Sequence, residues 1–186
     1  MEALDALLNR VSVPRLTDPA PNDAQREALF QAALRAPDHG QLRPWRFLTI
    51  EGQARERLGE LFASAVQKRG DASEAALSKA RAMPLRAPLL IVVIAHLHKQ
   101  HPKVPVLEQQ LAAGCAAHGI LIAAHAQGVG AVWRTGDLAF DAHVHEGLGL
   151  AENEELLGFL YVGTPMTEPR TAPVLATADF VSAWGD

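Results

Sequence analysis

VLEQQLAAGCAAHGILIAAHAQG, residues 106–128, overlaps the most apolar long stretch in the sequence, residues 111–133. Its Leu, Ile and Ala residues fall on nearly every side of a helix, and the stretch is about twice as long as an average helix. A membrane span has a similar length, but polar side chains interrupt the run at His118, His125 and Gln127. We therefore expect a helix buried on all sides in a soluble core, followed by a short buried strand.

Predicted strands and helices alternate on both sides of this helix. The run APLLIVVIAHL is continuously apolar and β-branched, which is typical of a strand covered on both faces. This run is residues 87–97, and the other predicted strands are residues 46–52, 129–136 and 153–165. The other predicted helices are residues 3–10, 22–36, 53–70, 72–85 and 141–150. This order indicates an α/β or α+β class with a buried sheet flanked by helices, in a single domain of residues 1–186.

Composition excludes several classes of protein. The chain has 186 residues, of which 48% are hydrophobic, so it can bury a sizeable core. A net charge of −4 gives no sign of a nucleic-acid partner. Cys115 is the only cysteine, so no intrachain disulfide is possible, and we expect it to be buried and unreactive. The N-terminus predicts an acidic amphipathic helix rather than a signal peptide, so we expect a cytoplasmic protein with no membrane contact.

Three short segments combine arginine with a hydroxyl, an imidazole or an indole. They are NRVSVPRL, RAPDHGQLRPW and WRTG, at residues 9–16, 35–45 and 133–136. Arg10 with Ser12 could clamp a phosphate, because a guanidinium offers a bidentate fork and a hydroxyl adds a donor. Taken singly, each of these arginines is better interpreted as a surface or capping residue. Three together favour an anionic ligand with a large planar part.

Histidines offer a second possible chemistry. His96, His98 and His101 alternate along an expected extended segment, which a transition metal could use. No carboxylate or cysteine stands close by in the sequence, so an exposed polar loop is the favoured interpretation. The same applies to the pair His143 and His145, while His118 and His125 are expected to be core or interface residues. Nucleotide-binding, zinc-protease and serine-hydrolase motifs are all absent from the sequence.

The last segment, residues 166–186, is rich in Pro and Ala and ends in Phe180, Val181 and Trp184. Apolar residues on a terminal arm usually dock on another surface. We expect this arm to bind a partner subunit.

The arginine segments, in this order, resemble those of the nitroreductase family, the FMN-dependent NAD(P)H oxidoreductases. NRVSVPRL is similar to the family's opening, LRAPDHGQLRPWRF to its Pro-Trp segment, and LLGFLYVGTP to its last core strand. The resemblance implies an α+β nitroreductase-like fold with a mostly antiparallel sheet flanked by helices and a long buried core helix. It also implies a homodimer with FMN at each subunit interface and a C-terminal arm that embraces the partner.

The resemblance also assigns site residues. The FMN contacts it implies are Arg10, Val11, Ser12, Arg35, His39, Gln41, Trp133, Arg134 and Thr135, with Arg35 and His39 reaching the flavin from the partner. The NAD(P) contacts it implies are Ala123, Ala124, His125, Ala126, Gln127 and Gly128. Three positions depart from the family pattern: Val11 replaces an Arg, Gln41 an Asn, and Arg43 a Gln. Whether Arg43 contacts the flavin is left open.

The implied reaction passes a hydride from NAD(P)H through bound FMN to an oxidised acceptor such as a nitroaromatic or quinone, with ping-pong kinetics. The flavin would carry the chemistry, so no side chain is assigned as catalytic and no metal is expected. The alternatives are a flavoprotein with another redox substrate, a non-enzymatic FMN-binding protein, or a metal protein that uses His96, His98 and His101. The sequence does not choose between NADH and NADPH.

Overall fold

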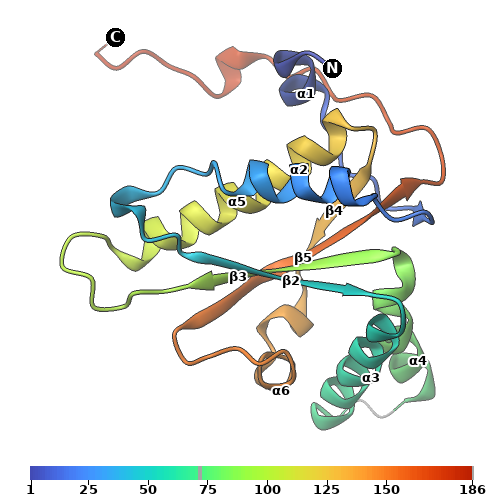
Figure 1. The fold of residues 1–186 in the computed structure, drawn as a ribbon. Coiled ribbons are helices and arrows are strands. Elements are labelled where there is room, and N and C mark those ends of the chain that lie inside the picture. The colour runs from blue at the N-terminus through green and yellow to red at the C-terminus, as the bar shows by residue number, and fades with distance from the viewer. Residues whose placement is uncertain (71–72, 186) are drawn as a thin grey trace.

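The computed structural model describes residues 1–70 and 73–185 and shows a sheet between two layers of helices (Figure 1). The strands are β1 (Leu16–Thr17), β2 (Trp45–Glu51), β3 (Leu89–His96), β4 (Gly130–Arg134) and β5 (Glu154–Pro165). β3 lies between β2 and β5, while β4 and β1 also pair with β5. Every pairing in the described residues is antiparallel. The predicted α+β class with a mostly antiparallel sheet is confirmed.

Two sets of helices cover the two faces of the sheet. The helices are α1 (Ala3–Asn9), α2 (Asp23–Ala33), α3 (Gln53–Lys68), α4 (Glu74–Ala82), α5 (Val106–Ala126) and α6 (Ala142–Gly147). α2 and α5 pack on one face, and α3 and α6 lie on the other, with α4 against α3 (Figure 1). Asn22 begins α2 with a capping box, in which its side chain accepts the Gln25 N–H and the Gln25 side chain accepts the Asn22 N–H.

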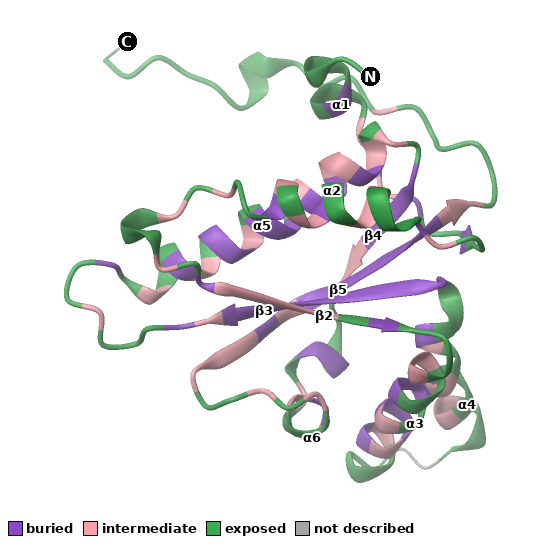
Figure 2. Cartoon of the chain, in the orientation of Figure 1, coloured by how far each residue is buried: buried purple, intermediate pink, exposed green. Residues whose placement is uncertain are grey.

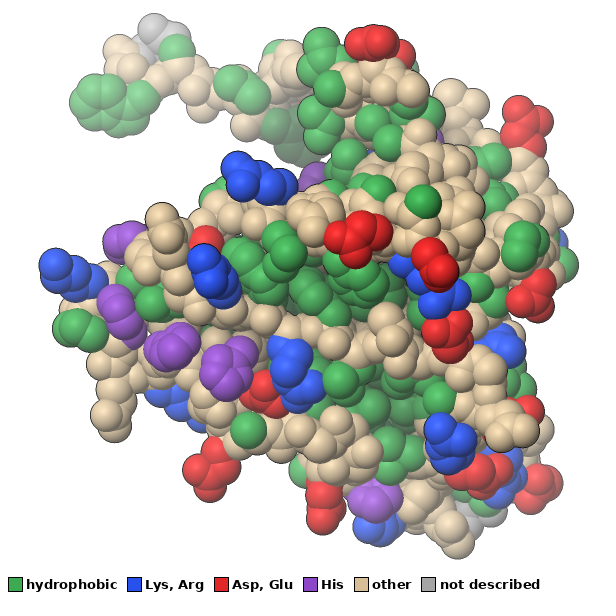
Figure 3. All heavy atoms as spheres, viewed as in Figure 1, with side chains coloured by type: hydrophobic (Ala, Val, Ile, Leu, Met, Phe, Trp, Pro, Cys, Tyr) green, Lys and Arg blue, Asp and Glu red, His purple; other side chains and the backbone are tan. Residues whose placement is uncertain are grey.

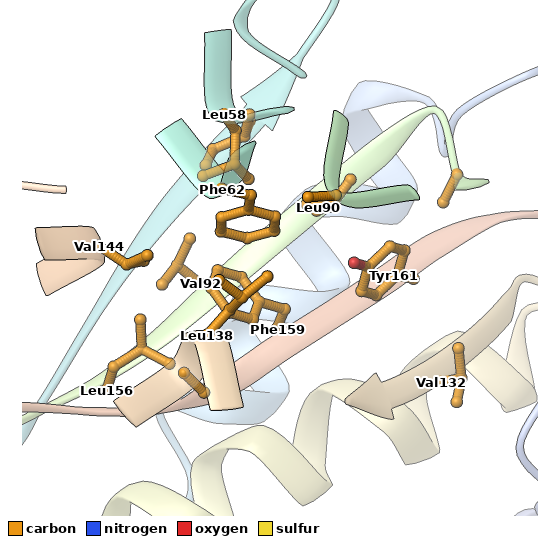
Figure 4. Close-up of a cluster of buried hydrophobic side chains, with 14 of the residues drawn as sticks. Leu58, Phe62, Leu90, Val92, Val132, Leu138, Val144, Leu156, Phe159 and Tyr161 are labelled. Carbon is orange, nitrogen blue, oxygen red and sulfur yellow. The ribbon is translucent and has the colours of Figure 1, made fainter. Parts of the chain in front are cut away.

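Each face of the sheet has its own core because side chains alternate along every strand. On the α3 side, the rings of Phe62 and Phe159 meet edge to face at 5.4 Å (Figure 4). On the α5 side, Leu29, Ile120 and Leu160 are fully buried. β3 contributes to both cores, and its residues from Leu89 to Ala95 are fully buried. The prediction of a strand covered on both faces is confirmed.

One prediction about the core helix is wrong: α5 is not buried on all sides. Leu107, Leu111, Cys115 and His118 form an exposed stripe along it. Figure 2 shows α5 with intermediate and exposed segments as well as buried ones. The expected burial of Cys115 is therefore wrong as well. An apolar pattern shows that a surface avoids water, but it does not show whether the same chain covers that surface. α5 is also long and apolar enough to cross a membrane, a test that the core helix of a soluble protein passes too.

The two chain ends also expose apolar side chains. In α1 only Ala6 is buried, while Leu4, Leu7 and Leu8 are exposed. The segment after β5 passes α1 and extends away from the helices and sheet (Figure 1). Its Phe180, Val181 and Trp184 are exposed. Apolar surface is thus concentrated on α1, on one side of α5 and on the C-terminal arm.

Candidate functional site

The first arginine segment lies along the free edge of β4. The N–H of Val13 donates to the carbonyl of Ala131 at 2.9 Å, and the Leu16 side chain lies against Gly130. The segment therefore runs antiparallel to β4, which places Arg10 and Ser12 beside the second half of the strand. Val11 is buried, so an arginine at this position would have to enter the core.

Two adjoining cavities open beside this edge. One of about 390 Å³ is lined by Ser12, Arg15 and Arg170, with Glu168 as a carboxylate in its wall. A second of about 160 Å³ shares Val13 and Pro169 with the first and is also lined by Val11, His125 and Gly128. The fold thus brings the N-terminal segment with Val11 and Ser12 next to the end of α5. The sequence analysis treated these two segments separately. Arg15 and Arg170 were missed there, although Arg15 stands in the NRVSVPRL segment.

The end of α5 contains a polar atom without a partner. His125 Nε2 is buried and has no hydrogen bond within residues 1–70 and 73–185. Leaving a buried polar group unpaired costs about 1–3 kcal/mol, so this nitrogen is available to a ligand, a second chain or a water molecule. Gln127 is engaged, because its amide donates to the Ala123 carbonyl at 3.0 Å. Ala124 is buried in the core, whereas Ala126 is exposed.

The end of β4 directs its residues to opposite faces of the sheet. The indole N–H of Trp133 donates to the Leu157 carbonyl at 3.1 Å, and the ring packs against the core on the α5 side. Arg134 points to the other face and lines a cavity of about 360 Å³ with Arg86, Thr135 and Tyr161. No carboxylate lines this cavity, and Arg86 was missed by the sequence analysis.

Arg134 carries the second unpartnered buried atom. Its Nε has no hydrogen bond in the described part of the chain, and its guanidinium carbon lies 5.7 Å from the centre of the Tyr161 ring. Burial raises the pKa of the Tyr161 phenol, against the opposing effect of the positive charges on Arg86 and Arg134. The phenol is therefore a neutral hydrogen-bonding group. The cavity offers positive charge and donors above an apolar floor that includes Phe62 and Phe159.

The second arginine segment lies at the opposite end of α5. His39 Nδ1 is 2.7 Å from a carboxylate oxygen of Glu108, in the first turn of that helix. A cavity of about 600 Å³ in this segment is lined by Arg35, Gln41 and Arg43, together with Trp45. Both Arg35 and Gln41 are exposed.

One chain cannot bring all the predicted residues to one ligand. Glu108, which binds His39, and His125 are 17 positions apart on α5, which spans about 25 Å at 1.5 Å per residue. The segment with Arg35, His39 and Gln41 is thus far from the group that contains Ser12 and His125. On the α5 side of the sheet, the predicted site falls into two parts at the two ends of one helix, while Arg134 and Thr135 lie on the opposite face.

The histidine loop does not assemble a metal site in the described residues. His side chains gather on the left of the face in Figure 3, near the loop between β3 and α5. His96 Nδ1 pairs with Glu154 at 3.1 Å, and His98 stacks edge to face on His96. His101 Nδ1 accepts the Val104 N–H at 2.9 Å. No group of three or more His, Cys, Asp or Glu that could hold a metal ion occurs in residues 1–70 and 73–185.

Comparison with known proteins gives consistent results. Residues 7–164 match the Nitroreductase family. The chain is 42% identical over 172 residues to "Putative NAD(P)H nitroreductase YdjA" of Escherichia coli (strain K12), covering 92% of this chain and 93% of that protein. It is 40% identical over 183 residues to "Putative NAD(P)H nitroreductase" of Haemophilus influenzae, covering 98% and 99%.

Solved structures share the fold. A nitroreductase-like family protein from Bacillus cereus superposes with a TM-score of 0.81 at 23% identity, covering 100% of this chain and 97% of that one. A variant of the FMN and NADPH-dependent nitroreductase NfnB from sphigopyxis sp. strain HMH gives a TM-score of 0.76 at 18% identity, covering 100% of both chains. Homologues with this fold thus bind FMN and use NAD(P)H.

Proposed function

Because this chain belongs to the nitroreductase family and is an oxidoreductase of the NAD(P)H nitroreductase type, we propose that two copies bind FMN between them and pass hydride from NAD(P)H to an oxidised acceptor. A nitroaromatic or a quinone is the proposed class of acceptor. The observation that carries this proposal is the division of the site between the two ends of α5. Arg35 and Arg43 lie near the beginning of α5, and Arg15 and His125 near its end. A ligand with anionic and polar groups could bind at both ends only if a second copy brought them together.

The exposed stripe on α5 supplies a way to bring the two ends together. Leu107, Leu111, Cys115 and His118 continue to the half-buried Ile122, so Cys115 stands at the centre of the stripe. Two copies of α5 packed antiparallel about Cys115 would form an isologous contact, as in most homodimers. The first turn of each helix would then lie beside the last turn of the other. The Arg35 and His39 of one copy would approach the cavities of the second copy near Ser12 and His125.

The cavities fit the parts of FMN. The phosphate matches the cavity at the sheet edge, where Ser12 and Arg15 offer a hydroxyl and a guanidinium beside Arg170. The planar ring matches the apolar and cationic surface around Arg134, whose Nε lacks an acceptor. A flavin carbonyl is an acceptor of the kind that this nitrogen requires. When bound, FMN supplies a centre that accepts a hydride and later releases it.

The side chains of this protein contribute binding, orientation and electrostatics. Ser12 and Arg15 would hold the phosphate end in the cavity at the edge of β4, with Arg10, two residues before Ser12, as a further proposed contact. The positive charges of Arg134 and Arg86, which line one cavity, would stabilise negative charge on a ring bound there. The loop of the second copy covers the site and limits access of water. A single place used first by NAD(P)H and then by the acceptor would give ping-pong kinetics.

An absorption spectrum tests the proposed function. The purified protein is mixed with FMN, passed through a desalting column and then given NADPH or NADH without oxygen. We expect a protein-bound flavin spectrum that bleaches with at least one of the two donors and returns when a nitroaromatic or a quinone is added. Protein that retains no flavin, or retains a flavin that neither donor bleaches, would overturn the proposal.

The single cysteine tests the proposed dimer. Because Cys115 is exposed at the centre of the stripe, a short thiol-reactive crosslinker should join two copies through it. Leu111→Glu places a charge in the stripe and should abolish both the crosslink and the dimer seen by light scattering. Leu85→Glu is the matched control, since Leu85 is exposed but lies outside the stripe, between α4 and β3. A monomeric wild-type protein would contradict the arrangement.

A further inference from the structure

The loop between α2 and β2 holds its backbone in an unfavourable conformation. Gln41 and Arg43 have φ of 54° and 50°, and they are the non-glycine residues with positive φ in residues 1–70 and 73–185. Arg43 also precedes Pro44, a position that normally favours extended backbone. Non-glycine residues with positive φ are destabilising, and they tend to occur at functional sites where the surroundings enforce them.

Asp38 and Trp45 fix this conformation. The two carboxylate oxygens of Asp38 accept the N–H groups of Leu42 at 3.1 Å and Arg43 at 2.7 Å. The Arg43 carbonyl accepts the N–H of Trp45 at 2.8 Å. Arg43 is thus held from both sides of its backbone. The backbone conformation from which its exposed side chain projects is therefore fixed.

The loop carries positive charge without a partner. Arg35 and Arg43 line the cavity of about 600 Å³, and neither guanidinium has a hydrogen bond or ion pair within the part of the chain that the structure describes. The one carboxylate in the cavity wall, Asp38, already accepts two backbone N–H groups. By contrast, Arg26, Arg46 and Arg69 each pair with a carboxylate.

The rest of the cavity suits a planar molecule. Trp45 offers an indole and Gln41 an amide, next to the aliphatic side chain of Leu34. Basic side chains stand around apolar surface between α2 and β2, in the region of this loop (Figure 3). Guanidinium groups bind carboxylates and similar anions in a bidentate manner and also stack on planar groups.

We propose that Arg43, with Arg35, selects an electron acceptor that is both planar and anionic, such as an aromatic carboxylate. This inference rests on the proposed function, which places the loop over the flavin site of the second copy. A neutral acceptor of the same shape gains the stacking but leaves both guanidinium groups without a counterion. The enzyme therefore discriminates between acceptors by charge.

Two isosteric acceptors test this discrimination. We expect kcat/KM of the FMN-loaded enzyme to be at least about fivefold higher for 4-nitrobenzoate than for 4-nitrobenzamide, since the two have the same shape and only the benzoate is charged, even though the amide makes the nitro group easier to reduce. Arg43→Gln should lower that ratio to near one, and Arg43→Lys should restore part of it. Arg57→Gln is the matched control, because Arg57 is an exposed arginine on α3, outside the cavity. An equal ratio in wild type and Arg43→Gln would overturn the inference.

A binding measurement separates this inference from the proposed function. Benzoate and benzamide are titrated into the oxidised, FMN-loaded protein, and the change in the flavin spectrum is followed at low and high salt. We expect benzoate to bind more tightly than benzamide, with an advantage that shrinks in salt and in Arg43→Gln. If NAD(P)H fails to bleach the flavin but benzoate still binds in this way, the proposed function fails and the anion site stands. If the flavin bleaches but Arg43→Gln changes only the NADPH to NADH preference, the assignment to the acceptor is wrong.

Discussion

His39 joins the loop after α2 to the first turn of α5, with its Nδ1 2.7 Å from a carboxylate oxygen of Glu108. Both side chains are about half exposed, so the contact positions the loop more than it stabilises the fold. At the other end of the same helix, His125 faces the cavity that continues toward Ser12. α5 therefore sets the distance between the two halves of the candidate site.

Replacing Arg10 should weaken the binding of FMN more than the binding of riboflavin. If Arg10 holds the phosphate, Arg10→Ala removes a bidentate interaction that riboflavin, which lacks the phosphate, never makes. We expect FMN affinity to fall by about tenfold or more, corresponding to about 1.4 kcal/mol, while riboflavin affinity is unchanged. Flavin fluorescence titration measures both constants. Equal losses for the two flavins would show that Arg10 does not contact the phosphate.

Two substitutions at Gln41 should separate backbone strain from side-chain function. Both Gln41→Gly and Gln41→Ala remove the amide, but only glycine adopts φ of 54° without strain. We expect the glycine variant to be more stable than the alanine variant by about 1 kcal/mol. Urea unfolding of the two flavin-free variants measures this difference.

The same two variants report on ligand binding. If the Gln41 amide contacts the flavin, both variants should lose FMN affinity to a similar extent, whatever their stability. A glycine variant that is no more stable than the alanine variant would argue that Asp38 and Trp45 do not hold the loop in a strained conformation.

Two glycines on α5 should respond oppositely to alanine. At Gly119 a Cβ would lie 2.9 Å from the Ala32 carbonyl oxygen, so Gly119→Ala must push α2 and α5 apart. We expect a loss of about 1–3 kcal/mol in unfolding free energy. At Gly114 no atom of the same chain beyond the neighbouring helix backbone lies within 4 Å of such a Cβ, so in the monomeric Leu111→Glu background Gly114→Ala should be neutral or stabilise by up to about 1 kcal/mol. Similar losses for both variants would rule out the contact with Ala32 as the cause.

Glu154 should make the free energy of unfolding depend on pH in the acidic range. Arg46 donates two hydrogen bonds to this nearly buried carboxylate, at 2.8 and 2.6 Å, and lowers its pKa to about 2, with further help from the Ala151 N–H and His96. An unfolded chain binds the proton at higher pH than the folded protein does. The stabilisation is therefore complete above about pH 4.5 and is lost as the pH falls toward about 2.

Glu154→Gln measures this contribution. We expect the variant to be less stable than wild type near neutral pH, by an amount on the order of 2–3 kcal/mol, and the difference to shrink in urea unfolding at about pH 3. Glu60→Gln is the control, because Glu60 pairs with Arg81 at an exposed position. A difference for Glu154→Gln that is constant with pH would show that its charge is not responsible.

The longer helices and strands of this fold could be predicted from local pattern, whereas the short strand β1 and the assembly of the site could not. β3 was predicted because continuous β-branched residues suit a strand covered on both faces. Trp133 and Arg134 were grouped as neighbours in sequence, but the pleat of β4 turns them to opposite faces of the sheet. Arg86 and Arg170 gave no sequence signal, since they reach their cavities from distant segments.

The order of residues alone establishes the family, the helices and strands, and the presence of three unusual arginine segments. These properties depend on local spacing and on motifs that are short in sequence. Three-dimensional packing settles which residues meet: Ser12 with the cavities at the end of α5, and Arg35 with Arg43 at its beginning. It also shows that one side of α5 is exposed, because whether an apolar surface is covered depends on every element around it and not on the helix that carries it.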